Sequence, residues 1–198
     1  MKPWKSGALG VAFLLAGCAS SARAVDVKVW ELSAATVGKE IGPQSRDGLR
    51  AVAPAAGGVQ ALAGGGALEN RHLFVVVQLG ATAAMIFSKN PDAEDAPARV
   101  EMVILGAGQA AGTIKSVRLV KTGGGEAVLG WSTETAEAEL KLGVGRAFVE
   151  LRPGKGAESV ELRAAAQYAM LPDFFADDVV YDPRKFSAPE LAIPAENL

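Results

Sequence analysis

The stretch from Ala136 to Leu142 reads A-E-A-E-L-K-L, and it alternates apolar and charged residues more regularly than any other part of the chain. Successive side chains of a β-strand point to opposite faces of the sheet, so this order gives one apolar face and one charged face. The stretch therefore predicts a strand that packs one face on a core and turns the other to solvent.

Similar short apolar segments lie on both sides of this strand. Three precede it, at residues 100–105, 117–119 and 128–131, and two follow it, at 147–151 and 160–163. Glycine-rich turns separate them, and the strands recur about every 8 to 12 residues. This spacing is typical of an all-β, antiparallel β-sandwich, immunoglobulin-like or jelly-roll-like, and we expect about seven to nine strands.

Residues 25–87, nearer the beginning of the chain, contain further segments that predict strands and one that predicts a loop. Residues 25–29 alternate and predict the first strand, whereas 73–79 are apolar on both faces and predict a central strand, with 84–87 as its neighbour. Between them, residues at about 34–68 are rich in glycine and alanine, which offer little to pack. We expect a long Gly/Ala-rich loop there, within the sandwich domain.

Length and composition limit the possible classes of protein. The chain has 198 residues, 49% hydrophobic and 21% charged, which predicts one folded domain with tails. Its formal net charge is -2. Nucleic-acid-binding proteins need a positive surface to contact phosphates, so we expect no nucleic-acid partner.

The first 24 residues have the pattern of a secretion signal. Lys2 and Lys5 precede an apolar run over residues 7–16, and no acidic residue occurs in this part. An apolar run of about ten residues is too short for a permanent membrane span and is typical of a signal peptide. We therefore expect residues 1–24 to be a leader, 25–170 a sandwich domain, and 171–198 an irregular, proline-rich C-terminal tail.

The leader ends in Leu15-Ala16-Gly17-Cys18, which resembles the lipobox of bacterial lipoprotein precursors. The resemblance implies lipidation of Cys18 and a membrane anchor, with the protein in the cell envelope or periplasm. Cys18 is the only cysteine, so it has no partner for an intramolecular disulfide. Cleavage after Ala24 is the alternative, and it predicts a soluble periplasmic or secreted protein.

One motif suggests an enzyme. Gly106, Gly108 and Ala111 follow an apolar segment in a pattern that resembles the dinucleotide-binding fingerprint of flavin and nicotinamide oxidoreductases, and Glu126 takes the place of the ribose-binding acid. The resemblance implies a helix over residues 113–121. That range contains four β-branched residues and an alternating pattern, which favour a strand and a glycine-rich turn instead.

The remaining residues give no catalytic set. His72 is the only histidine, and without a second His or a mature-region Cys it predicts no zinc site; we expect it to cap the following strand. An alternative site is aromatic: Phe174, Tyr181 or a tryptophan could form an exposed surface that stacks on a carbohydrate. We expect a non-catalytic binding or structural domain without cofactor or metal, with an envelope protein or a carbohydrate as possible partner. The alternatives are a dinucleotide-dependent oxidoreductase and a carbohydrate-binding module.

Overall fold

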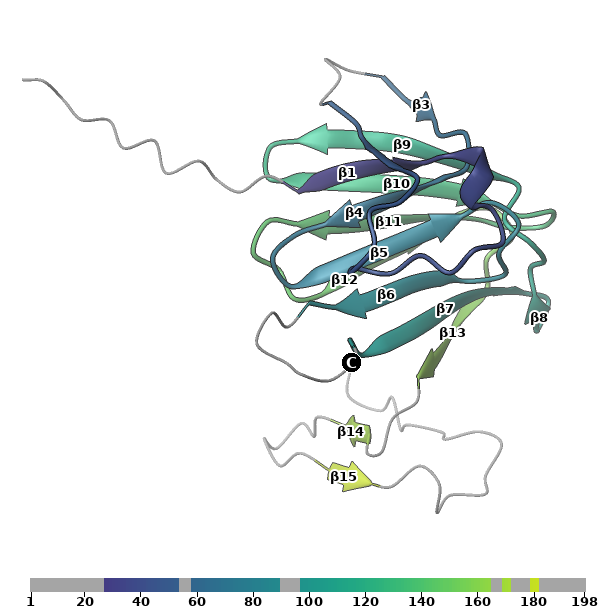
Figure 1. Cartoon of the computed structure of the whole chain (residues 1–198). Coiled ribbons are helices and arrows are strands. Elements are labelled where there is room, and N and C mark those ends of the chain that lie inside the picture. The colour runs from purple at the N-terminus through teal and green to yellow at the C-terminus, as the bar shows by residue number, and fades with distance from the viewer. Residues whose placement is uncertain (1–26, 54–57, 90–96, 165–168, 172–178, 182–198) are drawn as a thin grey trace, which may run out of the picture.

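The computed structural model contains two packed antiparallel β-sheets and a separate two-stranded sheet (Figure 1). It describes residues 27–53, 58–89, 97–164, 169–171 and 179–181. The expected all-β antiparallel sandwich is confirmed, and the single helical element in the described part is a short 3-10 turn, η1 (Ala34–Thr36).

The larger sheet, sheet A, has eight strands in the order β13-β7-β6-β5-β4-β1-β2, with β8 paired to β7. Their bounds are β1 (Lys28–Leu32), β2 (Leu49–Ala51), β4 (Gly65–Glu69), β5 (Leu73–Gln78), β6 (Ala84–Ser88), β7 (Arg99–Gly106), β8 (Gln109–Ala110) and β13 (Ser159–Ala164). Because β5 lies between β4 and β6, the prediction of a central strand at 73–79 with 84–87 beside it is confirmed.

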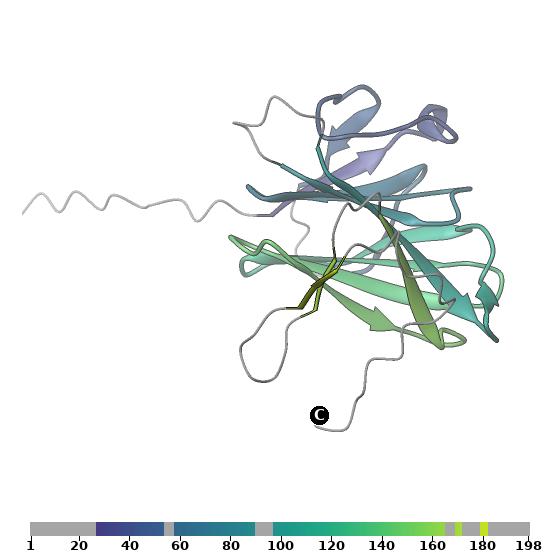
Figure 2. The same ribbon diagram turned by 90° about the horizontal axis from the view of Figure 1, so that it is seen from below.

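Sheet B has five strands in the order β12-β11-β10-β9-β3. Their bounds are β3 (Gln60–Ala61), β9 (Ser116–Gly123), β10 (Glu126–Ser132), β11 (Glu137–Gly143) and β12 (Val149–Pro153). The chain passes from sheet B back to sheet A between β12 and β13, so these two consecutive strands form one edge of each sheet. Figure 2 shows the green strands of sheet B as a layer beneath the blue and teal strands of sheet A.

The described part holds fifteen strands, more than the seven to nine that we expected. Five of them have only two or three residues: β2, β3, β8, β14 (Ala169–Leu171) and β15 (Val179–Tyr181). A strand this short has too few residues to reveal an alternation, so the sequence pattern misses it. The last two pair with each other: β14 spans the expected boundary between the sandwich domain and the tail, and β15 lies within the expected tail, where we predicted no regular element.

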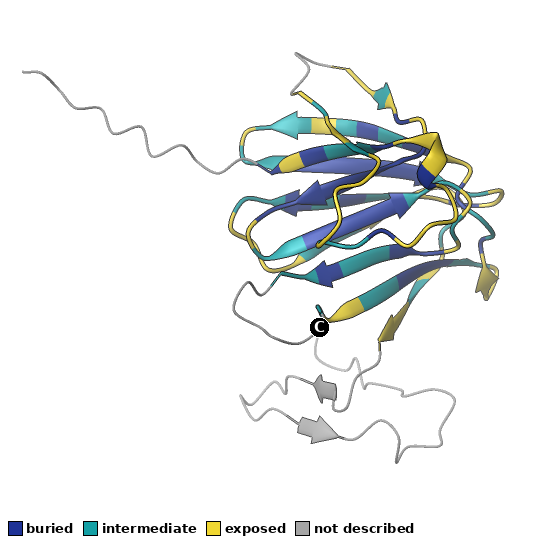
Figure 3. Ribbon diagram, in the orientation of Figure 1, coloured by how far each residue is buried: buried dark blue, intermediate teal, exposed yellow. Residues whose placement is uncertain are grey.

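The main core fills the space between the sheets. It includes Val75 and Val77 of β5 together with Leu129 of β10 and Leu140 of β11, and all four are fully buried. Along β11 the residues alternate in burial as the sequence predicts, because the charged residues of this strand lie on the outer side. Figure 3 shows buried residues gathered on the central strands, such as β4 and β5.

Part of the expected loop at about 34–68 is a buried strand. All five residues of β4 are buried, between β1 and β5 in sheet A. A Cβ on Gly65 would lie 2.4 Å from the carbonyl oxygen of Val77, and one on Gly66 would lie 2.6 Å from the side chain of Leu62. The glycines are therefore needed for close packing, and the inference of flexibility from them was wrong at this strand.

A second, smaller core covers the outer face of sheet A. The segment of residues 33–48, here named the cover segment, leaves β1 and crosses in front of β4 and β5 (Figure 1). Its ends are close together, because the N–H of Ser33 donates to the carbonyl of Gly48 at 2.9 Å. Ile41 of this segment packs against Phe74, Val76 and other outer-face residues. Sheet A is therefore buried on both sides at its centre, which explains why β5 shows no alternation.

Two remaining features concern the surface. The turn of Gly123, Gly124 and Gly125 joins β9 to β10, and a Cβ on Gly124 would have no atom within 4 Å. Within the described residues, no helix is long and apolar enough to span a membrane.

Candidate ligand pocket

A pocket of about 520 Å³ lies on the outer face of sheet A, beside the cover segment. Val76 of β5 and Met85 and Phe87 of β6 contribute apolar side chains to it, and residues 37–41 of the cover segment form a wall. Its volume is in the range of pockets that hold small ligands. A mostly apolar lining with a few polar groups favours a ligand that is itself largely apolar.

The opposite wall comes from β7 and carries a cation between two carboxylates. The guanidinium of Arg99 donates to Glu40 of the cover segment at 3.0 Å and to Glu101 at 2.6 Å. The pair with Glu40 joins the two walls, but the side chain of Glu40 is 77% exposed. An ion pair in such a position contributes little free energy, because solvent screens it. Arg99 is thus a cation at the rim of an apolar pocket, and its outer partner is easily replaced.

A hydrogen bond keeps the wall of the cover segment in position. The side-chain amide of Gln78, at the end of β5, donates to the carbonyl oxygens of Thr36 and Lys39. Thr36 is buried, and its hydroxyl donates to the carbonyl of Ser33 at 2.6 Å. These contacts satisfy backbone carbonyls of a segment that has only a single 3-10 turn of its own.

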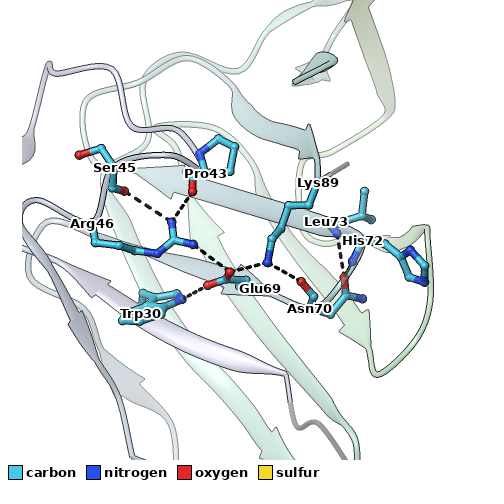
Figure 4. A network of polar contacts seen from close by, with 9 residues as sticks. All are labelled: Trp30, Pro43, Ser45, Arg46, Glu69, Asn70, His72, Leu73 and Lys89. Atoms are coloured by element: carbon cyan, nitrogen blue, oxygen red, sulfur yellow. Dashed lines mark hydrogen bonds and ion pairs between the residues drawn. The ribbon is translucent and has the colours of Figure 1, made fainter. Parts of the chain in front are cut away.

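A second anchor of the cover segment is a buried carboxylate. Glu69, the last residue of β4, accepts hydrogen bonds from Trp30 at 2.8 Å, Arg46 at 2.9 Å and Lys89 at 2.5 Å (Figure 4). The residue is only 4% exposed. Burial by itself would raise the pKa of Glu69, but the hydrogen bonds from Lys89 and Trp30 and the charges of Lys89 and Arg46 outweigh it, and the pKa is lowered.

Arg46 belongs to the cover segment, so this network fixes its far end. The guanidinium also lies 5.5 Å from the ring centre of Trp30 and 5.0 Å from that of Phe74, and it donates to the carbonyl of Pro43. At a partly buried position, charge-assisted hydrogen bonds and cation–π contacts are both stabilising, so together they hold the cover segment against sheet A. The guanidinium of Arg46 therefore lies over the ring of Trp30 and ties the cover segment to β1.

Asn70, the neighbour of Glu69, connects the two sheets. Its side-chain nitrogen donates to the carbonyl oxygens of Gly143 at 2.8 Å and Arg146 at 2.7 Å, in the connection between β11 and β12. Its oxygen accepts from the backbone N–H groups of His72 and Leu73, both at 2.8 Å. We expected His72 to cap β5, but Asn70 supplies the capping atom, and the Nε2 atom of His72 instead accepts a hydrogen bond from Arg71.

The proposed dinucleotide fingerprint has the wrong local structure for that function. Gly106 pairs with Gln109, and the two residues between them have positive φ angles, 51° for Ala107 and 72° for Gly108. Two such residues form the tight turn of a β-hairpin. Residues 116–123 are β9, so the strand favoured by the sequence forms in place of the helix that the resemblance implies over 113–121, and this segment offers no helix N-terminus to a pyrophosphate.

The other two residues of that motif are explained by packing and by surface charge. Ala111 is buried in the main core. Glu126 begins β10 and pairs with Lys121 and Lys141 on the surface. Gly106 lies near Thr135, which follows the end of β10, whereas Glu126 is at the beginning of β10. A strand of this length spans about 20 Å, so Glu126 is far from Gly106. A Cβ on Gly106 would lie 2.7 Å from the carbonyl oxygen of Gly156, so this glycine allows close backbone packing.

Cys18, Phe174 and Tyr181 are the remaining residues that the sequence singles out. Cys18, Phe174 and the leader lie outside the described residues, and the side chain of Tyr181 is not described. Trp131 is 2% exposed in the main core, as expected for a core residue. Within the described part, no group of three or more His, Cys, Asp or Glu residues is arranged to hold a metal.

No sequence pattern marked the residues of the pocket or of its two anchors as a site, although several of them lie in predicted strands. An Asn in a short polar stretch between two apolar segments, such as Asn70 before residues 73–79, is a turn signal that could have been used. Arg99 and Glu40 are far apart in the chain, and no local pattern relates them. Comparison of the chain with protein-family models, with curated proteins and with solved structures finds no match.

Proposed function

We propose that this is an exported, lipid-anchored binding protein of the cell envelope, and that its pocket takes a small amphipathic carboxylate. The observation that carries the ligand proposal is the position of Arg99 at the rim of the apolar pocket, with a well-exposed Glu40 as its outer partner. A ligand carboxylate would replace Glu40, and the ligand's apolar part would pack on Val76, Met85 and Phe87.

The choice of a carboxylate over other ligands follows from charge. The pocket lining contains two basic residues, Lys39 and Arg99, and two acidic ones, Glu40 and Glu101. Glu101 is less exposed than Glu40 and lies on the same strand as Arg99, so it stays in place. With Glu40 displaced, the rim has two cations against one anion and suits a single negative charge. A phosphate monoester, with more charge, would meet too few cations.

Export and anchoring are supported by the leader. The charged start, the short apolar run and the Leu15-Ala16-Gly17-Cys18 sequence resemble those of lipoprotein precursors. Mass spectrometry of the mature N-terminus tests this part. An acylated Cys18 at the N-terminus is the expected result, and an unmodified N-terminus at Val25 would instead indicate a protein without the anchor.

The ligand proposal is tested with a matched set of probes of equal chain length: octanoate, octylamine and octanol. We expect octanoate to bind most tightly in calorimetry. Removing the charge with Arg99→Gln should weaken octanoate binding about tenfold or more, because a charge-assisted hydrogen bond is lost. Arg118→Gln, which removes an arginine of sheet B, is the control and should leave binding unchanged.

A second variant distinguishes displacement of Glu40 from simple attraction to a positive charge. Glu40→Gln removes the competing carboxylate, so octanoate should bind more tightly than to the unchanged protein, whereas octanol should bind equally to both. The proposal fails if octylamine binds as tightly as octanoate, or if Arg99→Gln has no effect on octanoate.

A further inference from the structure

A four-residue sequence occurs twice near the end of the sandwich. Val-Glu-Leu-Arg stands at residues 149–152 and again at 160–163. The first copy lies in β12 and the second in β13, which are the edge strands of sheet B and sheet A. Within the described residues, no strand pairs with the outer edge of either one. Unpaired edges of this kind accept a strand from another chain.

The two edges differ in how open they are. Leu162 of β13 is 64% exposed, whereas Leu151, at the same place of the repeated sequence in β12, is partly buried against the main core. Glu150 of β12 is engaged by Lys141 at 2.7 Å. β12 also ends in Pro153, which has no N–H to offer to a partner strand. Of the two edges, β13 is therefore the better site for association.

We propose that β13 pairs antiparallel with β13 of a second copy of this chain, with Leu162 at the two-fold axis. In this register Leu162 faces Leu162 of the second copy, and Val160 faces Ala164. Glu161 then faces Arg163, and by symmetry Arg163 faces Glu161. Apolar residues meet apolar residues on one side of the joined sheet and opposite charges meet on the other, which is the complementarity that stabilises cross-strand pairs.

The other symmetric registers lack this complementarity. A two-fold axis at Glu161 places two glutamates opposite each other, and an axis at Arg163 does the same with two arginines. An axis at Val160 places Leu162 opposite Glu158. Like charges directly opposite each other destabilise a strand pair, so the sequence of β13 favours the register centred on Leu162.

The neighbouring strand β7 extends the same pattern. Met102 is opposite Leu162, and Glu101 is opposite Arg163. In the pair of chains, the apolar row therefore continues from Met102 across both leucines to Met102 of the second copy. Arg163, which donates to Glu161 of its own strand at 2.8 Å, would lie between Glu101 and Glu161 of the second copy. Exposed Leu162 would thereby be covered.

Sedimentation of the full-length chain in mild detergent, with Cys18→Ser in all variants, tests the proposal. The chain with β13 unchanged should be a dimer at micromolar concentration. Arg163→Glu places two carboxylates opposite each other at two symmetric positions and should weaken the dimer about tenfold or more. Arg152→Glu makes the same change in the repeated sequence of β12 and is the matched control, which should remain a dimer.

Exchange of the two charges separates pairing from a general loss of stability. Glu161→Arg together with Arg163→Glu restores opposite charges across the axis, so the double variant should again be a dimer. Leu162→Cys should also give a disulfide-linked dimer in air, because the two side chains at the axis are within reach of each other. The proposal is overturned if the unchanged chain is a monomer, if the exchange does not restore the dimer, or if Arg152→Glu weakens it as much as Arg163→Glu.

Discussion

Asn70 makes four hydrogen bonds with its side chain, two as donor and two as acceptor, although it is only 4% exposed. The two acceptors are the carbonyls of Gly143, the last residue of β11 in sheet B, and of Arg146, in the connection that follows it. A buried amide of this kind is specific in its chemistry, because one end must donate and the other must accept. Neither a carboxylate nor an apolar side chain can satisfy both ends.

Substitution of Asn70 is therefore expected to lower the free energy of unfolding. Asn70→Ala leaves two carbonyls and two N–H groups without their partner and should cost about 1–3 kcal/mol. Asn70→Asp should cost more at neutral pH, because a carboxylate oxygen would face the two carbonyls. Urea denaturation measures both changes. An aspartate variant as stable as the original protein would contradict the role given to the amide nitrogen.

Glu69 predicts a loss of stability in acid. The pKa of Glu69 is below its ordinary value of 4.5, so folding favours the ionised form. A lowered folded-state pKa contributes stability above the unfolded-state pKa, and this contribution is lost as the pH falls through the folded-state value. We expect the free energy of unfolding to fall below pH 4.5, and Glu69→Gln to reduce this pH dependence. The variant should also cost about 1–3 kcal/mol at pH 7.

Glu126→Gln is the control for this experiment. A hydrogen bond from Lys121 lowers the pKa of Glu126 as well, but this carboxylate lies on the surface of sheet B. Solvent screening makes such pairs weak, so the control should change the acid sensitivity less than Glu69→Gln does. Equal effects of the two variants would show that burial of Glu69 has no special role.

At the scale of single elements, glycines occur both in turns and inside a buried strand, and the sequence alone does not distinguish these two positions. Gly123, Gly124 and Gly125 form the turn that we expected between strands. Gly65 and Gly66, however, lie inside β4, where neighbouring atoms leave no space for a Cβ. Glycine composition predicts a loop in both cases, and only the long-range packing of β4 against β5 and sheet B distinguishes them. The long alternating strands, such as β11, depend on local pattern and were predicted.

The β7–β8 hairpin gives a prediction of increased stability. Ala107 has a φ of 51°, a conformation that costs a residue with a Cβ about 1–2 kcal/mol. Ala107→Gly removes this strain but adds freedom to the unfolded chain, so a net gain of about 0.5–1 kcal/mol is expected. Gly108→Ala, with a φ of 72° at the next position, should have the opposite sign. Thermal unfolding of the two variants decides whether the turn has this geometry.

At the scale of the whole molecule, the two apolar cores differ in their connections. The main core joins both sheets, whereas the second core joins sheet A only to the cover segment. The sequence predicted the main core because its strands alternate or are continuously apolar. It did not predict the second core or the pocket, because both require the cover segment to fold back on the sheet, and this depends on contacts such as Arg46 with Glu69.

Separate opening of the cover segment follows from this difference. Arg46→Ala removes the ion pair with Glu69 and the contacts with Trp30 and Phe74, while the main core is untouched. We expect amide hydrogen exchange in residues 33–48 to become about tenfold faster or more, with the strands of sheet B unchanged. Arg50→Ala is the control, since Arg50 is more exposed and its ion pair among the described residues is with Glu31. If both variants exchange at the same rate, Arg46 is not the anchor.

The turn of Gly123, Gly124 and Gly125 offers a practical opportunity. It projects from sheet B into open space, and the pocket and the β13 edge both belong to sheet A. Loop tips with this environment accept inserted sequence with small effects on the surrounding fold. A fluorescent tag or an affinity peptide placed after Gly124 would thus report on the location and oligomerisation of the protein without occupying either surface.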